Sequence, residues 1–250
     1  MSHLVLVLGM HRSGTSAIAG ALPCLGVSLG NRSSWSGPDN PNFHEDLDIL
    51  AIDELLLDRF GAKWDSPTVD VLTHAWAATD IKAAATIAVH TKLMQFPLLA
   101  IKEPRMCRLL PFWRPVLANI GCEVSVVHVI RHPMAVAKSL EKRNSIPIEA
   151  GLALWLDHVT KQFAEVDDTW PSVTVRYETF MSNPVSQIGR AGLALNLDFD
   201  QDAADHYADE FISYDLWHEQ ADYAAVMPDG VVFAWERAVA RALKTEGMLA

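Results

Sequence analysis

Residues 9–16 combine residue types that bind anions. They read Gly-Met-His-Arg-Ser-Gly-Thr-Ser and lie between an apolar run at residues 3–8 and a stretch with helical periodicity at residues 15–25. In such a strand–loop–helix turn, backbone N–H groups and the start of the helix converge on a bound phosphate. A nucleoside triphosphatase would carry Lys where this chain has Thr15. The segment predicts a phosphate site with Arg12 as its cation and disfavours ATP or GTP hydrolysis, the alternative being an ordinary glycine turn with a solvated Arg.

A second set of anion-binding residue types follows the apolar run at residues 123–130. Arg131 comes directly after this predicted strand, Pro133 opens a predicted helix, and Ser139 stands eight positions after Arg131. Ligands bind at the carboxyl ends of strands in open α/β sheets, and Arg can hold a phosphate with two parallel hydrogen bonds. Alone, the pattern could also be a helix start with a surface Arg. Coupled to residues 9–16, it predicts two anion sites, as a nucleotide with phosphates at both ends requires.

Candidate groups for proton transfer and charge stabilisation lie in two further segments. The apolar run at residues 97–102 ends in Lys102, followed by Glu103-Pro104-Arg105, at the same predicted sheet edge. Phe43-His44-Glu45-Asp46 opens a predicted helix after a loop dense in turn formers. Carboxylates and imidazoles can remove a proton, and cations can stabilise developing negative charge. Two alternatives remain, namely a lysine that simply faces water and acidic residues that only stabilise a helix N-terminus.

At these motifs the sequence resembles the sulfotransferase family, which uses 3'-phosphoadenylyl sulfate (PAPS). The family's phosphosulfate loop has Lys or Arg followed by Ser-Gly-Thr-Ser or Ser-Gly-Thr-Thr, and residues 12–16 fit it. Its 3'-phosphate motif has the Arg, Pro and Ser spacing of residues 131–139, and its Tyr-Glu element matches residues 177–178. Its Lys-Asp-Pro strand end is similar to residues 102–104, with Glu in place of Asp. The resemblance spans roughly residues 3–180 and is specific only at the motifs.

The resemblance implies a role for each matched residue. The loop would hold the 5'-phosphate through backbone and hydroxyl groups, while Arg131 and Ser139 would hold the 3'-phosphate. Arg12 and Lys102 would stabilise the sulfuryl group and the leaving oxygen. The implied donor-binding residues are Arg12, Ser13, Gly14, Thr15, Ser16, Arg131, Ser139 and Tyr177.

The general base stays open among three residues. Glu45 is the first choice, because a carboxylate in a partly dry cleft can have its pKa raised towards working pH, and because several bacterial and protein-tyrosine sulfotransferases have a similar aromatic-then-Glu segment. His44 is the second choice, and Glu103 is a further alternative. Cytosolic animal members use a His after a Lys-Thr pair, which this chain lacks. Their C-terminal Arg-Lys-Gly segment is also absent, so the adenine contacts are not assigned.

The spacing of apolar runs predicts the fold that positions these groups. Runs rich in Val, Ile and Leu alternate with segments of helical periodicity, which is typical of a mostly parallel sheet with helices on both faces. We expect an α/β, three-layer fold that is P-loop NTPase-like, with residues 1–250 forming a single domain. The predicted strands are residues 3–8, 97–102, 123–130 and 172–177, the last ending in Tyr177. The predicted helices are residues 15–25, 80–95, 133–143, 146–166 and 231–244.

The charge and residue composition of the chain indicate which partners it can bind and in which cellular compartment it works. The chain has 250 residues and a formal net charge of -11, which opposes binding to nucleic acid or an anionic membrane. No apolar run reaches membrane length, and the three cysteines have no C-x-x-C spacing, so we expect a soluble, cytoplasmic protein. No metal site is expected, because His128 and His132 cannot share a helical face. Residues 26–30 match the G-x-S-x-G pattern of a serine hydrolase's nucleophile elbow. That motif needs a strand before it, whereas here a predicted helix precedes it, so we do not expect a hydrolase.

The function that these features favour is transfer of a sulfuryl group from PAPS to a hydroxyl acceptor, with 3'-phosphoadenosine 5'-phosphate (PAP) as product. The alternatives are a P-loop small-molecule kinase and a non-catalytic nucleotide-binding module. The acceptor could be a small molecule, a carbohydrate, a lipid or a peptide. We expect its pocket to come from residues 31–43, 61–77 and 210–230, with Trp35 as one contact. The oligomeric state stays open.

Overall fold

Buried parallel strands form the centre of the molecule. The computed structural model describes residues 2–31, 43–69, 79–210, 212 and 226–247. Within them, a four-stranded sheet has the order β2-β1-β3-β4, and every neighbouring pair is parallel. The strands are β1 (His3–Leu8), β2 (Leu98–Lys102), β3 (Glu123–Ile130) and β4 (Ser172–Arg176). Parallel strands bring their carboxyl ends to one edge, where the predicted anion and catalytic residues follow them.

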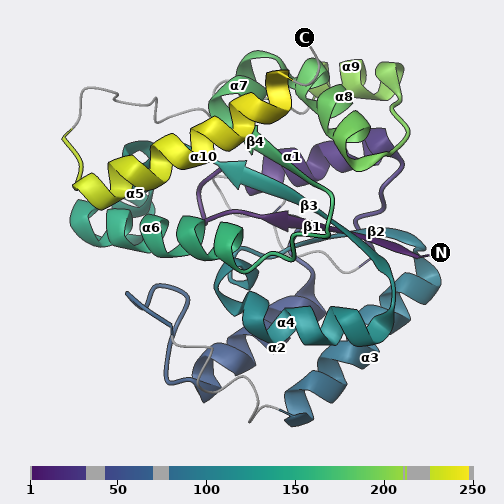
Figure 1. Cartoon of the computed structure of the whole chain (residues 1–250), viewed down its shortest axis with the longest axis horizontal. Coiled ribbons are helices and arrows are strands. Elements are labelled where there is room, and N and C mark those ends of the chain that lie inside the picture. The colour runs from purple at the N-terminus through teal and green to yellow at the C-terminus, as the bar shows by residue number, and fades with distance from the viewer. Residues whose placement is uncertain (1, 32–42, 70–78, 211, 213–225, 248–250) are drawn as a thin grey trace.

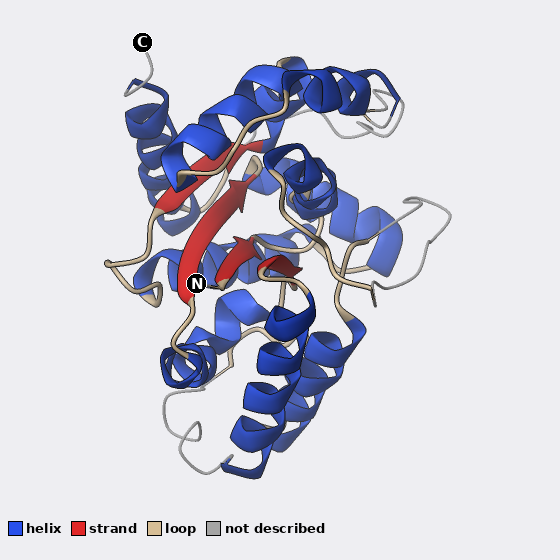
Figure 2. Ribbon diagram, turned by 90° about the vertical axis from the view of Figure 1, so that its right-hand side faces the viewer, coloured by secondary structure: helices blue, strands red, loops and turns tan. Residues whose placement is uncertain are grey.

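Helices cover both faces of this sheet (Figure 2). Leu4, Leu6 and Leu8 of β1 face one hydrophobic cluster, and Val5 and Val7 face another, as the two-residue period of a strand requires. The first face is covered by α2 (Leu47–Arg59), α3 (Thr79–Gln95) and α4 (Met106–Ile120). The second is covered by α1 (Thr15–Ala21), a 3-10 helix η1 (Leu22–Leu25), α8 (Pro184–Leu195) and α9 (Gln201–Glu210).

A third cluster packs beyond the end of β3. It is built from α5 (Pro133–Asn144), α6 (Ile148–Ala164) and α10 (Asp229–Gly247). The short helix α7 (Tyr177–Ser182) directly follows β4. In Figure 1, α10 is the yellow helix that runs along β4 and α6. The α/β, P-loop NTPase-like fold predicted from the sequence is confirmed by the parallel sheet and its covering helices.

Three predicted boundaries were wrong for a local reason, and the ends of the other predicted helices and strands differ from the structure by at most three residues. The helix predicted at residues 15–25 ends at Ala21 and continues as the 3-10 helix, where Pro23 cannot donate an α-helical hydrogen bond. The helix predicted to open at Phe43 begins at Leu47, because the Asp46 side chain caps it by accepting from the N–H groups of Asp48 and Ile49. Tyr177 opens α7 and does not close β4.

Candidate active site

The loop between β1 and α1 has a backbone that only certain residues can adopt. A Cβ on Gly9 would lie 2.7 Å from Thr15 Cγ2 and 2.8 Å from the Val129 carbonyl oxygen, so glycine is required there. Arg12 and Gly14 have positive φ values of 68° and 85°. A positive φ is uncommon in a residue such as Arg and is often found at functional sites. The loop is thus held in a wound conformation directly before α1.

The hydroxyl residues of this loop have three different surroundings. Ser13 is 1% exposed, and its Oγ has no hydrogen-bond partner within the described part of the chain. Thr15 is buried, and its methyl group packs against Gly9. Ser16 Oγ donates to the Phe43 carbonyl at 3.2 Å. A buried hydroxyl without a partner is uncommon, so Ser13 Oγ is the loop hydroxyl best placed to bind a ligand oxygen.

The two predicted anion motifs touch each other. Arg12 Nε donates to Ser139 Oγ at 2.8 Å, although 127 residues separate them. Arg131 Nη1 donates to the Arg12 carbonyl oxygen at 2.9 Å. Both Arg131 and Ser139 are buried. The loop after β1 and the turn between β3 and α5 therefore form one cationic region, in which Arg12 reaches towards Ser139.

Tyr177 connects this region to the end of β4. The Arg131 guanidinium lies 4.7 Å from the centre of the Tyr177 ring, a cation–π contact. The same ring packs on Gly14 so closely that a Cβ there would overlap it. Burial raises the pKa of the Tyr177 hydroxyl, which stays protonated at neutral pH. Tyr177 thus contacts both anion motifs.

Lys102 and Glu45 form an ion pair at the carboxyl end of β2. Lys102 Nζ lies 2.7 Å from Glu45 Oε1 and donates to the Phe43 carbonyl at 3.0 Å. The Lys102 side chain is 2% exposed and that of Glu45 is 15% exposed. Glu45 also forms an isolated parallel bridge with Lys102, which explains why this residue lies outside α2. The predicted cation and the first-choice base are therefore side by side, with the carboxylate on the more exposed side.

The Phe43 carbonyl was not foreseen from the sequence. It accepts hydrogen bonds from both Ser16 and Lys102 and so links the start of α1 to the end of β2. A backbone carbonyl carries no residue-type signal, because every residue has one.

His44, the second-choice base, lies against α1. Its φ is 54°, and a Cβ on Gly20 would be 3.0 Å from its Nε2. Burial, and then the charge of Lys102, lower the pKa of His44 to about 4. The imidazole is therefore neutral at physiological pH, but its ring packs beside Gly20.

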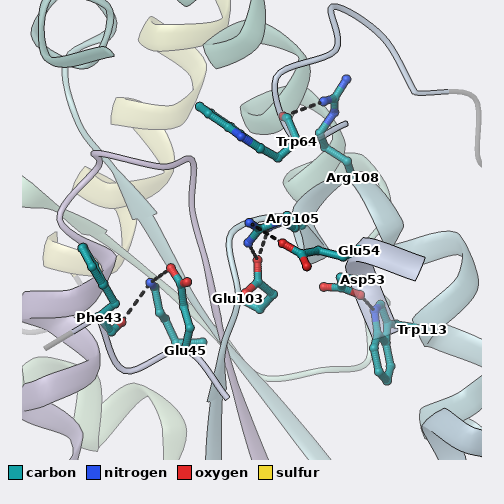
Figure 3. Close-up of polar contacts among 10 residues, drawn as sticks. Phe43, Glu45, Asp53, Glu54, Trp64, Glu103, Arg105, Arg108 and Trp113 are labelled. Carbon is teal, nitrogen blue, oxygen red and sulfur yellow. Dashed lines mark hydrogen bonds and ion pairs between the residues drawn. The ribbon is translucent and has the colours of Figure 1, made fainter. Parts of the chain in front are cut away.

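Glu103 and Arg105, which follow β2, pair with each other. Glu103 is fully buried, and its Oε1 accepts from Arg105 Nη1 at 2.7 Å. Figure 3 shows Arg105 between Glu103 and Glu54, with Asp53 and Trp113 beside them. Burial raises the pKa of both Glu103 and Asp53. Arg105 is thus paired with two carboxylates, yet it lies close enough to the loop for its charge to lower the pKa of His11, after the larger effect of burial.

An aromatic wall next to the loop was also missed by sequence reasoning. The His11 ring lies 4.8 Å from the Trp64 ring, centroid to centroid. The Trp64 segment is fixed by Arg108, which donates to the carbonyls of Trp64 and Ser66 at 3.2 and 2.8 Å. Arg108 also pairs with Asp157 at 2.6 Å. The segment after α2 is thus anchored to α4 and α6, beside the loop of residues 9–16.

The features set aside in the sequence have structural roles. His128 stacks on Phe163 with ring centroids 4.4 Å apart, and His132 precedes α5 with its ring 5.3 Å from that of Trp235. Ser28 follows a 3-10 helix and accepts from the Gly30 N–H. In the described ranges, no group of three or more His, Cys, Asp and Glu residues is arranged to hold a metal.

The predicted acceptor pocket draws mostly on residues outside the described part of the chain. Residues 32–42, including Trp35, residues 70–77 and most of residues 210–230 lie outside the described residues. Among the helices that the structure does describe, none combines the length and apolar character needed to span a bilayer.

Comparison with known proteins identifies the fold. No family model and no curated protein sequence matches the chain. The structure is similar to the sulfotransferase domain from the curacin biosynthetic pathway, with a TM-score of 0.58 and 16% identity over 96% of this chain and 98% of that one. It is also similar to the sulfotransferase domain from the Synechococcus PCC 7002 olefin synthase, with a TM-score of 0.57 and 15% identity over 95% and 94% of the two chains. Retinol dehydratase in complex with androsterone and inactive cofactor PAP aligns with a TM-score of 0.43 at 12% identity, over 98% of this chain and 79% of that one.

Proposed function

We propose that this chain, which has the fold of sulfotransferase domains, transfers a sulfuryl group from PAPS to a hydroxyl acceptor by in-line displacement. The observation that carries the proposal is the contact between the two anion motifs, through Arg12, Ser139 and Arg131. A donor with phosphates on both the 3' and the 5' oxygens of its ribose needs two such sites close together. A kinase has no use for the second site, and this chain has Thr15 where a triphosphate-binding loop has Lys.

The residues present fit PAPS on three observations. Ser13 has a buried hydroxyl with no hydrogen-bond partner in the described chain, and the residues on either side of it, Arg12 and Gly14, have positive φ values. Arg131 and Ser139 are buried beside this loop and can hold a 3'-phosphate. Lys102 is a cation at the neighbouring strand end. When bound, PAPS supplies a sulfuryl group that bonds to the acceptor oxygen as its bond to the 5'-phosphate oxygen breaks, leaving PAP.

In this proposal the chain contributes charge and a proton acceptor. Arg12 and Lys102 stabilise negative charge on the transferring group and on the leaving phosphate oxygen, which is where electrostatic stabilisation is most effective. Glu45 takes the proton from the acceptor hydroxyl, because its carboxylate is partly exposed next to Lys102. His44 packs against α1 and Glu103 is fully buried, so both are less suited to this role.

The acceptor is a small-molecule, carbohydrate, lipid or peptide hydroxyl. Small molecules are the first class to screen, since the two similar sulfotransferase domains belong to a biosynthetic pathway and an olefin synthase. We further propose that residues 1–250 act as one domain in the cytoplasm, in keeping with three free cysteines.

A paired transfer assay tests the proposal. The protein is incubated with an acceptor panel and either sulfur-labelled PAPS or γ-labelled Mg-ATP. Label transfer from PAPS without added metal supports the proposal, whereas transfer from Mg-ATP alone would establish the kinase alternative.

A further inference from the structure

Glu178 holds the backbone next to the predicted 3'-phosphate residue. It lies in the first turn of α7, and its Oε1 accepts a hydrogen bond from the His132 N–H at 2.8 Å. His132 directly follows Arg131 and is the N-cap residue of α5. The contact joins two segments that are 46 residues apart in the sequence. It therefore fixes the turn from which the Arg131 side chain extends.

The start of α5 lacks a cap from its own sequence. The His132 side chain makes no capping hydrogen bond, and Pro133 follows at the first helical position. In a capping box, a Glu or Gln at the third helical position accepts from the N-cap N–H, but here that position is Ala135. Glu178 supplies the same hydrogen bond from another element.

The neighbouring residue holds the Arg131 side chain. The Tyr177 ring lies against the Arg131 guanidinium and against Gly14. Residues 177 and 178 therefore fix Arg131 twice, once through its side chain and once through the backbone that follows it. Such double support restricts the orientation of a guanidinium that must meet a phosphate in a fixed geometry.

The charge of Glu178 does not help an anion to bind nearby. Its second oxygen, Oε2, is buried and has no hydrogen-bond partner in the described residues. A carboxylate oxygen buried without a partner is costly, and the negative charge of Glu178 opposes a phosphate on Arg131. The hydrogen bond to His132, and not the charge, is the useful feature of this residue.

We infer that Glu178 is a positioning residue for the 3'-phosphate, acting through the His132 N–H on Arg131. The inference rests on the proposed function, because it assigns Arg131 to the 3'-phosphate of PAPS. It goes beyond that function by predicting that a neutral hydrogen-bond acceptor at position 178 is sufficient.

The test compares PAP with AMP, which lacks only the 3'-phosphate. Calorimetry gives the ratio of the two dissociation constants for the wild type, Glu178→Gln and Glu178→Ala. The matched control is Glu149→Ala, which removes an exposed acidic residue from the first turn of α6. We expect Glu178→Ala to reduce the preference for PAP by roughly tenfold, the range of a lost hydrogen bond to a charged group. Glu178→Gln should keep the preference within about threefold because its amide oxygen still accepts the hydrogen bond.

The ratio of the PAP and AMP dissociation constants distinguishes a role in positioning Arg131 from a general loss of structure. A purely structural role would weaken PAP and AMP equally and leave the ratio unchanged, which would overturn the inference in a folded Glu178→Ala variant. A Gln variant that behaves like the Ala variant would overturn it as well. If the Ala variant does not fold, Glu178→Asp, which keeps the charge but shortens the reach, should show the reduced ratio. A wild type that binds neither ligand would instead reject the proposed function, and this inference with it.

Discussion

Arg12 Nε donates a hydrogen bond to Ser139 Oγ at 2.8 Å, and this contact joins the two predicted anion motifs across 127 residues of the chain. It exists because β1 and β3 are parallel neighbours whose carboxyl ends lie side by side. The loop after β1 carries Arg12, and the helix after β3 carries Ser139. The sheet topology thus brings two separate sequence motifs into one cationic region, which we propose binds the 3'- and 5'-phosphates of PAPS.

Replacing Arg131 should weaken binding of PAP much more than binding of AMP. Arg131→Ala removes a cation that can hold the 3'-phosphate bidentately, and we expect roughly a 10- to 100-fold rise in the dissociation constant of PAP. The change for AMP should stay within about threefold. Calorimetry with both ligands measures this, with Arg114→Ala as control because Arg114 is a half-exposed arginine on α4. Equal losses for the two ligands would remove Arg131 from the 3'-phosphate site.

Glu45→Gln should separate binding from chemistry. The amide still accepts from Lys102 but cannot take a proton, so PAP binding should be normal while transfer falls by about 10²- to 10⁴-fold. Single-turnover transfer from labelled PAPS measures the loss, using an acceptor found in the screen. His44→Asn is the comparison, since His44 packs beside Gly20. If His44→Asn abolishes transfer and Glu45→Gln does not, the two roles must be exchanged.

Gly14→Ala should destabilise the protein more than Gly26→Ala. Both glycines have positive φ values, 85° and 72°, and an alanine in that conformation costs about 1–2 kcal/mol. Nothing lies within 4 Å of a Cβ on Gly26, whereas a Cβ on Gly14 would overlap the Tyr177 ring. The difference between the two free energies of unfolding, measured in urea, isolates that overlap. Equal losses would show that the Tyr177 ring can move aside without cost.

Stability should fall as the pH drops below 6.5, partly because of His128. Burial, and then the charge of Arg241, lower the pKa of His128 from 6.5 to about 3. Between these pH values the unfolded chain therefore takes up a proton on His128 and the folded chain does not. The stabilisation that comes from keeping His128 neutral is complete above pH 6.5 and is lost as the pH falls towards 3. From pH 8 to pH 5 the loss from this one residue is on the order of 2 kcal/mol.

Urea unfolding of His128→Phe at both pH values tests this expectation. The variant keeps an aromatic ring beside Phe163 and should lose less stability between pH 8 and pH 5 than the wild type. His90→Gln is the control, because His90 is exposed on α3. An unchanged pH dependence in His128→Phe would contradict the assigned pKa.

Much of the fold could be read from the sequence because the strands are buried on both faces. The run at residues 123–130 was predicted with the bounds of β3, since continuous Val and Ile residues are typical of buried parallel strands. The helix α4 was not predicted, because Pro111 and Pro115 lie inside it. Packing of residues such as Phe112 and Trp113 into the core outweighs the helix-breaking effect of the prolines.

The site was only partly predictable, because its key contacts are long-range. Local motifs placed Arg12, Lys102 and Arg131 at the correct strand ends. They could not show that Lys102 pairs with Glu45, since 57 residues separate the two and the pairing depends on a bridge between segments. Nor could they show that Arg105 pairs inward with Glu103, because a surface arginine and a buried one have the same sequence signature.

Calorimetric titration of the wild type with PAP in the presence of EDTA, compared with ATP plus magnesium, tests the central claim most directly. Two adjacent anion sites without a triphosphate-binding lysine should bind PAP without metal, and more tightly than they bind Mg-ATP. Binding of Mg-ATP in preference to PAP would contradict the proposal that this chain uses PAPS.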